Sequence, residues 1–129
     1  MPFPNLILRT DHTILLRILV NMAINALEAS NEQDTVKIWV EEQPEEVVFK
    51  VWNAQVIQED VARRIFQRNF STKQQEGRGI GTFSMKILGE KILHGNVAFT
   101  SSQQEGTTFS FRHPRQVKSS HAAELFKCA

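Results

Sequence analysis

The chain has 129 residues, of which 41% are hydrophobic and 22% are charged, and its formal net charge is +1. This length suits one domain with one core, and these fractions are ordinary for a globular protein, so they exclude a disordered or fibrous chain. No apolar run approaches the length of a membrane span. The only cysteine, Cys128, cannot form an internal disulfide, which fits a reducing compartment.

The first part of the chain predicts a short strand and then a long helix. A β-type apolar run stands at 6–9, and Thr10 or Asp11 is suited to cap the helix that follows. That helix, at 12–30, carries apolar residues at helical spacing, namely Leu15, Ile18, Leu19, Met22 and Ala26.

The rest of the chain predicts two hairpins separated by helices. The strands of the hairpins are expected at 35–43, 46–53, 96–102 and 107–113. Between the hairpins we expect a short basic helix at 58–70, a loop at 71–79 and a helix at 82–93 that ends at Gly95. This order separates strand pairs from helices, so it predicts an α+β two-layer sandwich.

Three glycines, Gly77, Gly79 and Gly81, lie in the most basic part of the chain. From Arg63 to Lys91 there are seven bases and two acids. Main-chain amides at such glycines can approach an anion closely, so the segment predicts an anion site. A solvated surface loop is the alternative interpretation.

Two asparagines, Asn21 and Asn25, lie four residues apart on one flank of the apolar stripe of the long helix. A half-buried amide without a hydrogen-bond partner costs roughly 1 to 3 kcal/mol, so these side chains need partners. Taken alone, they are explained by local bonds to the backbone.

Four segments together resemble the sequence boxes of the Bergerat-fold ATPases, the superfamily of histidine kinases, gyrase B, MutL and heat-shock chaperone ATPases. ILVNMAINALEAS resembles the asparagine box, GRGIG the second glycine box, RIFQRNFSTK the phenylalanine box of histidine kinases, and EGTTFSF their closing Gly-Thr box. The resemblance implies a Bergerat fold, with a mixed, mostly antiparallel sheet packed on helices. It also implies a catalytic and ATP-binding domain at 1–114, a tail at 115–129, and a mobile ATP lid over 58–78.

The resemblance further implies the residues of an Mg-ATP site. Asn25 matches the Mg²⁺ ligand, and Lys73 matches a contact to the γ-phosphate that Arg78 assists. Asn53 stands in the place of the aspartate that accepts a hydrogen bond from the adenine amino group. The remaining nucleotide contacts are expected at Gly77, Gly79, Gly81 and Thr107.

One position separates the subclasses of this superfamily. Members that use water carry a glutamate four residues before the magnesium asparagine, and here that residue is Asn21. An amide does not accept a proton at neutral pH, so transfer to an imidazole is favoured over hydrolysis. The resemblance therefore implies a sensor histidine kinase of a two-component system, with Asn21 and Lys73 as its expected catalytic residues.

The expected partners follow from the same resemblance. None of the histidines, His12, His94, His113 and His121, has the surroundings of a phosphoacceptor box, so we expect the acceptor histidine on a separate dimerisation domain of the same kinase. A response regulator is the second expected partner, and no nucleic acid is expected. The fragment is expected to be monomeric, within a homodimeric parent kinase in the cytoplasm or on the cytoplasmic side of a membrane-bound sensor.

Two alternatives differ in function. Ala54, Gln55 and Val56 occupy the region of the family's first glycine box, so one alternative is a degenerate domain that acts as a regulatory binding module with weak or no nucleotide affinity. The other is a serine kinase of the anti-sigma-factor type, which shares the fold but is disfavoured by Asn21.

Overall fold

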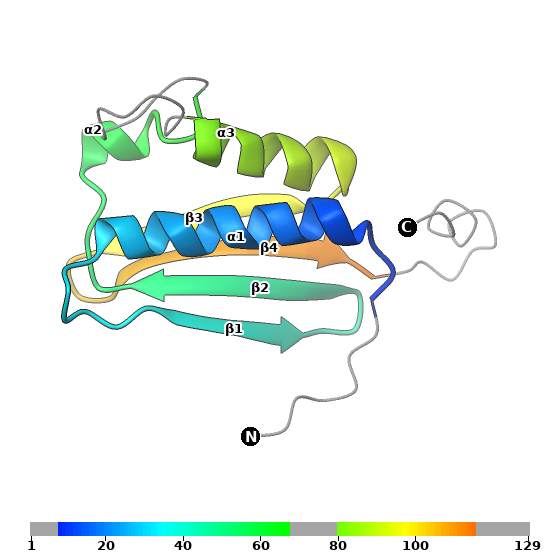
Figure 1. Cartoon of the computed structure of the whole chain (residues 1–129), viewed down its shortest axis with the longest axis horizontal. Helices are drawn as coiled ribbons and strands as arrows, with labels where there is room; N and C mark the ends of the chain where they lie inside the picture. The colour runs from blue at the N-terminus through cyan, green and yellow to red at the C-terminus, as the bar shows by residue number, and fades with distance from the viewer. Residues whose placement is uncertain (1–7, 68–79, 116–129) are drawn as a thin grey trace.

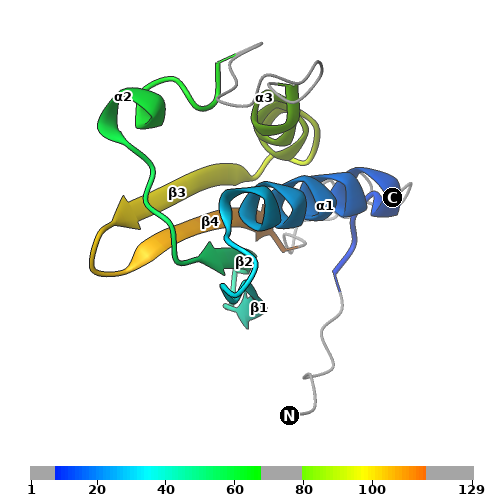
Figure 2. The ribbon, with the colours of Figure 1, turned by 60° about the vertical axis from the view of Figure 1, so that its left-hand side comes forward.

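The computed structural model describes residues 8–67 and 80–115, in which helices cover one face of a four-stranded sheet (Figure 1). In chain order the elements are α1 (His12–Ala29), β1 (Lys37–Glu42), β2 (Glu46–Asn53), α2 (Glu59–Ala62), α3 (Ile80–Ile87), the π-helix η1 (Leu88–Ile92), β3 (Asn96–Ser102) and β4 (Gly106–Pro114). Figure 2 shows α1 and α3 on the same side of the sheet. The predicted α+β two-layer sandwich is confirmed.

The strands of the described sheet run in the order β1-β2-β4-β3, and each of its three pairings is antiparallel. Both predicted hairpins are confirmed. The β2–β4 pairing places Asn53 opposite Thr107, so two residues 54 positions apart in sequence become neighbours on the helix side of the sheet. Leu8 and Arg9 form no strand, and the rest of the strand predicted at 6–9 lies outside the described residues.

Helix α1 begins where the sequence predicts. Asp11 is its N-cap, because the Asp11 side chain accepts a hydrogen bond of 3.1 Å from the Ile14 N–H. The apolar stripe of α1 is buried against the sheet, with Ile18, Met22 and Ala26 at most 2% exposed. Helical periodicity therefore predicted the buried face of α1 correctly.

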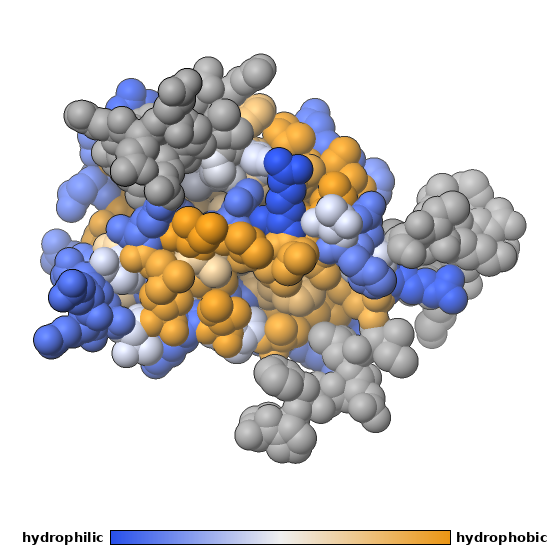
Figure 3. Space-filling view, viewed as in Figure 1, coloured by the Kyte–Doolittle hydropathy of each residue, from blue (hydrophilic) through white to orange (hydrophobic). Residues whose placement is uncertain are grey.

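The opposite side of α1 is also apolar, and it faces outward. Figure 3 shows a hydrophobic surface that runs along α1. Its most exposed residues on this helix are Leu16, Val20, Ile24 and Leu27. Polar residues of α1 are thus concentrated on one flank, the flank that carries Asn21, Asn25 and Glu28.

Helix α2 is shorter than predicted, since it ends at Ala62 and not at residue 70. After it the chain turns inward, and Ile65 becomes part of the core. The Thr82 hydroxyl of α3 donates to the Ile65 carbonyl oxygen, so a side chain distant in sequence supplies the bond that a longer helix would have made. Residues 68–78 of the predicted lid lie outside the described residues.

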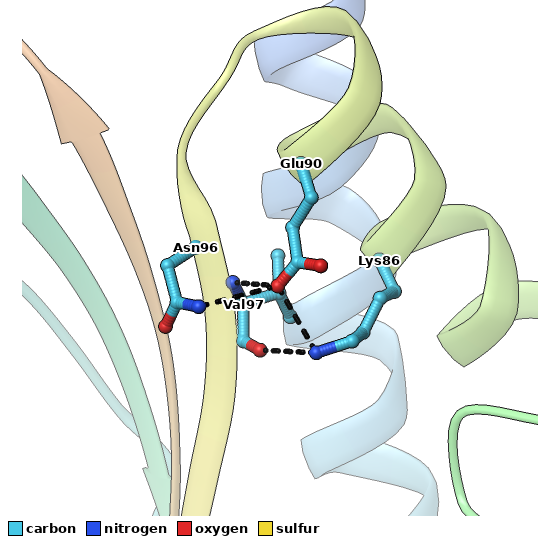
Figure 4. Close-up of polar contacts among 4 residues, drawn as sticks. All are labelled: Lys86, Glu90, Asn96 and Val97. Atoms are coloured by element: carbon cyan, nitrogen blue, oxygen red, sulfur yellow. Dashed lines mark hydrogen bonds and ion pairs between the residues drawn. The ribbon is translucent and has the colours of Figure 1, made fainter.

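The helix predicted at 82–93 is present as α3 followed directly by η1. Glu90 of η1 fastens this helix to the first residues of β3 (Figure 4). Its Oε2 accepts hydrogen bonds from the Lys86 ammonium and the Val97 N–H, both at 3.0 Å. Lys86 also donates to the Val97 carbonyl oxygen at 3.1 Å. Val97 of β3 therefore both donates to and accepts from side chains of the helix.

The end of this helix differs from the prediction in detail. Helix η1 ends at Ile92, and the left-handed residue that follows is His94, with φ of 61°, and not Gly95. Gly95 is required for space, since a Cβ there would lie 2.1 Å from the Arg112 carbonyl oxygen. The glycine thus permits close packing on β4, while a histidine carries the strained backbone angle.

His113 of β4 is completely buried, and it joins the two ends of the described chain. Its Nδ1 lies 2.8 Å from the Pro114 carbonyl oxygen, which can only accept, so Nδ1 carries the proton. Its Nε2 then accepts from the Thr10 hydroxyl at 2.8 Å. Burial lowers the pKa of His113, although the bond to Pro114 acts in the opposite direction.

No helix within residues 8–67 and 80–115 has the length and apolar character needed to cross a membrane.

Candidate functional site

A cavity of about 340 Å³ lies on the helix side of the sheet, between the last turns of α1 and the segment that follows β2. Such a volume is typical of pockets that hold a small ligand. Apolar side chains such as Val61, Ile65 and Phe109 form part of its wall, with a few polar groups among them. The described residues that line it are Asn25, Glu28, Ala29, Asn53, Gln55, Val56, Ile57, Gln58, Val61, Ile65, Thr107 and Phe109.

One wall of the cavity is the polar flank of α1, from which Asn25 and Glu28 line it. Asn21 lies one turn before Asn25 and is directed toward α3, where its Nδ2 donates to the Gly81 carbonyl oxygen over 3.4 Å. This long hydrogen bond places the first turn of α3 against the same flank. The polar residues of α1 therefore face the cavity and α3.

The opposite wall begins at Asn53, the last residue of β2, which is 3% exposed. The Asn53 Oδ1 accepts a hydrogen bond of 2.9 Å from the Gln55 N–H. This local bond across two residues is the turn that asparagine commonly forms at the end of a strand. It directs the chain out of the sheet and along the cavity.

Three hydroxyl and carbonyl groups hold this wall to β3 and β4. The Thr107 hydroxyl donates to the Gln55 carbonyl oxygen at 2.7 Å, and because that oxygen only accepts, the Ser101 hydroxyl must donate to Thr107 Oγ1, also at 2.7 Å. Ser101 Oγ in turn accepts from the Ile57 N–H at 2.9 Å. The bonds at residues 55 and 57 thus fix the segment between them.

Gln55 also links this wall to the loop after α1. Its Nε2 donates to Asp34 Oδ2 at 2.7 Å, and the same carboxylate oxygen accepts from the Asn31 N–H at 3.0 Å. The bond from Asn31 and then the bond from Gln55 lower the pKa of Asp34. An ionised Asp34 therefore joins the end of α1 to the segment after β2 at neutral pH.

Residues 10–117 match the family described as histidine kinase-, DNA gyrase B- and HSP90-like ATPases. The chain belongs to this ATPase family. The match covers most of the chain, including every residue named in the cavity.

Similar proteins within the ATPase family are histidine kinases. A probable C4-dicarboxylate sensor kinase of Halalkalibacterium halodurans is 31% identical over 108 residues, which are 82% of this chain and 20% of that protein. This chain therefore spans about a fifth of the length of that kinase.

Solved structures show the same likeness. The catalytic domain of histidine kinase ThkA has a TM-score of 0.74 and 29% identity, with 84% of this chain and 70% of that chain covered. ThkA in complex with the response regulator TrrA has a TM-score of 0.74 and 26% identity, over 88% of this chain and 32% of that one. The chain is thus an ATPase domain of the histidine kinase type, which favours the kinase interpretation over a degenerate binding module.

The structure brings three of the predicted site residues together, since Asn25, Asn53 and Thr107 all line the cavity. Asn21 and Gly81 contact each other beside it but do not line it. The other predicted residues, Lys73, Gly77, Arg78 and Gly79, lie outside the described residues.

Sequence reasoning did not assign Glu28 or Gln55 to the site. Helical spacing puts Glu28 on the same flank of α1 as Asn21 and Asn25, and the structure adds that it lines the cavity. Gln55 had been considered only as a departure from the glycine box, and its bonds to Thr107 and Asp34 depend on contacts across the sheet. No local signal in the sequence indicates those contacts.

Asn25 fits the magnesium ion that the resemblance implies. It supplies a neutral amide oxygen at the cavity wall, and Mg²⁺ in nucleotide sites takes few protein ligands because phosphates and waters fill the remaining positions. Among the described residues there is no group of three His, Cys, Asp or Glu side chains that could hold a metal by itself. A site completed by the nucleotide is consistent with this donor set.

Proposed function

We propose that this domain binds Mg-ATP in the cavity and supplies its γ-phosphate to a histidine on a separate dimerisation domain. One observation carries the proposal. Asn25, Asn53 and Thr107 come from α1, β2 and β4, and the fold assembles them around one cavity of suitable size. We expect the nucleotide to bind with its base near Asn53 and Thr107 and its phosphates toward α3.

We expect the phosphates at the start of α3, beside the cavity. This helix begins at Ile80, next to the α1 flank that carries Asn21 and Asn25. The first amides of a helix and the helix dipole attract anions. Asn25 would hold Mg²⁺ here, while Lys73, assisted by Arg78, and the amides at Gly77 and Gly79 would complete the phosphate contacts.

The reaction type follows from Asn21. A water molecule that attacks the γ-phosphate needs a proton acceptor, and the Asn21 amide cannot act as one. A neutral imidazole already presents its lone pair, so phosphoryl transfer to histidine requires mainly positioning and charge stabilisation. A response regulator would then receive the phosphoryl group, and the ThkA structure with TrrA supports such a partner.

Nucleotide binding is tested by isothermal titration with ATP in the presence and absence of magnesium. Asn25→Ala should weaken Mg-ATP binding by at least about tenfold and remove most of its dependence on magnesium. The control is Asn31→Ala, since Asn31 is exposed and lies outside the cavity. No binding by the wild type at millimolar nucleotide would refute the proposal and favour the degenerate module.

The reaction is tested by adding a histidine-bearing dimerisation domain of the parent kinase and measuring labelled phosphohistidine together with free phosphate. The wild type should transfer phosphate to the histidine and hydrolyse ATP negligibly, whereas Asn21→Glu should raise hydrolysis. Glu28→Gln is the matched test of the carboxylate that lines the cavity. Brisk wild-type hydrolysis that Glu28→Gln abolishes would assign the family's water chemistry to this domain.

A further inference from the structure

The side chain of Asn53 has a fixed orientation at the wall of the cavity. It is 3% exposed, it lines the cavity, and its Oδ1 accepts the Gln55 N–H at 2.9 Å. A flipped amide would direct an NH₂ group at that N–H, so two donors would face each other. One lone pair of Oδ1 is therefore used by the wall, so Asn53 can present its Nδ2 donor and the second lone pair of Oδ1 to a ligand.

The polar groups next to Asn53 hold the wall in place. Thr107 donates its hydroxyl proton to the Gln55 carbonyl oxygen, and Gln55 Nε2 donates to Asp34 Oδ2. Of the described residues that line the cavity, only Glu28 has a carboxylate, and it comes from α1 on the opposite wall. A ligand at the end of the cavity next to β2 therefore meets the neutral amide of Asn53.

The two common kinds of purine differ in what they offer such a group. A 6-aminopurine presents an amino donor at position 6, whereas a 6-oxopurine presents a carbonyl acceptor there. A carboxylate only accepts hydrogen bonds, so it would bind the amino group and repel the carbonyl. An amide both donates and accepts, so it repels neither.

We propose that the cavity binds 6-oxopurine nucleoside triphosphates as well as ATP, with affinities that differ by less than about tenfold. This inference rests on the proposed function, because it assumes that the cavity holds the base of a nucleotide. Asn53 is the residue that lets both kinds of purine bind. Its Nδ2 can donate to the carbonyl of a 6-oxopurine, and the remaining lone pair of its Oδ1 can accept from the amino group of a 6-aminopurine.

The test compares ATP with inosine triphosphate, since their bases differ in the group at position 6 and in the proton at N1 that accompanies it. Both are titrated with magnesium into the wild type and into Asn53→Asp, which keeps an acceptor for the Gln55 N–H. We expect affinities within about tenfold for the wild type and a shift of at least about tenfold toward ATP in Asn53→Asp. Gln103→Glu is the control, because it makes the same change from amide to carboxylate at an exposed position in the β3–β4 turn.

The outcomes separate this inference from the proposed function. A wild type that binds ATP more than about tenfold more tightly than inosine triphosphate would overturn the inference and leave the proposed function intact. An unchanged ratio in a folded Asn53→Asp would overturn the role of Asn53. Binding of neither nucleotide would refute both proposals, and the wild-type comparison remains decisive if Asn53→Asp fails to fold.

Discussion

Protonation of His113 should destabilise the domain as pH falls. The ring is 0% exposed, with Nδ1–H bonded to the Pro114 carbonyl and Nε2 bonded to the Thr10 hydroxyl. The Thr10 hydroxyl can rotate to accept a hydrogen bond from a protonated ring. What opposes protonation is burial of the charge, which lowers the pKa of His113.

The sign of the effect follows from linkage. The unfolded chain, with a histidine pKa near 6.5, binds the proton more readily than the folded domain does. Stability from this group is therefore complete above about pH 6.5 and is lost as pH falls toward the lower pKa of the folded state. The slope cannot exceed about 1.4 kcal/mol per pH unit for one proton. Each kcal/mol lost would lower Tm by roughly 4 °C in a domain of this size.

Urea unfolding between pH 5.5 and 7.5 tests this prediction, because this range lies above the titration of ordinary carboxylates. His113→Gln should be less stable than the wild type at pH 7.5 but lose less stability on acidification. His94→Gln is the control, since His94 is exposed. A His113→Gln variant that retains the full wild-type slope would show that another group causes the pH dependence.

Three further substitutions test particular features of the structure. Gly81→Ala should preserve or slightly raise Tm, because the new Cβ meets no atom within 4 Å. The same change should weaken ATP binding measured by titration, because the added Cβ would keep the phosphates from the backbone; unchanged binding would show that this backbone does not lie against them. His94→Gly should stabilise the domain by about 1 kcal/mol in urea unfolding by relieving the positive φ, and a loss of stability would contradict that explanation. Thr107→Val should cost roughly 1 to 3 kcal/mol, because it removes the donor to the Gln55 carbonyl; an unchanged free energy of unfolding would show that the hydroxyl chain contributes little.

Periodic patterns predicted the helices and strands well, because burial of one face determines both the spacing of apolar residues and the type of element. The stripe on α1 and the alternation in the two hairpins indicate which side chains face the core, and the structure buries the α1 stripe residues Ile18, Met22 and Ala26 and pairs the strands as expected. The asparagine flank of α1 was likewise visible in the sequence, since residues three or four apart share a helix face.

The wrong predictions depend on contacts between distant residues. The chain leaves α2 after Ala62, and the Ile65 carbonyl that follows is bonded by Thr82, 17 positions away in the sequence. The role of Gly95 depends on the backbone of Arg112 across the sheet, and the sequence could not show that His94 would take the left-handed angle. The nucleotide contact expected at Thr107 stays a prediction: Thr107 lines the cavity, and its hydroxyl proton is directed at the Gln55 carbonyl oxygen, a partner that the sequence did not indicate.

The hydroxyl chain from Ile57 through Ser101 and Thr107 to Gln55 has one permitted direction for its protons. A network without an alternative arrangement is already ordered when the domain folds, so a ligand does not have to order it. Most of the conformational entropy at this end of the cavity is therefore lost on folding and not on binding. Ligands that differ only in the atoms facing this wall should consequently differ in affinity through their direct contacts, with little contribution from reorganisation of the protein.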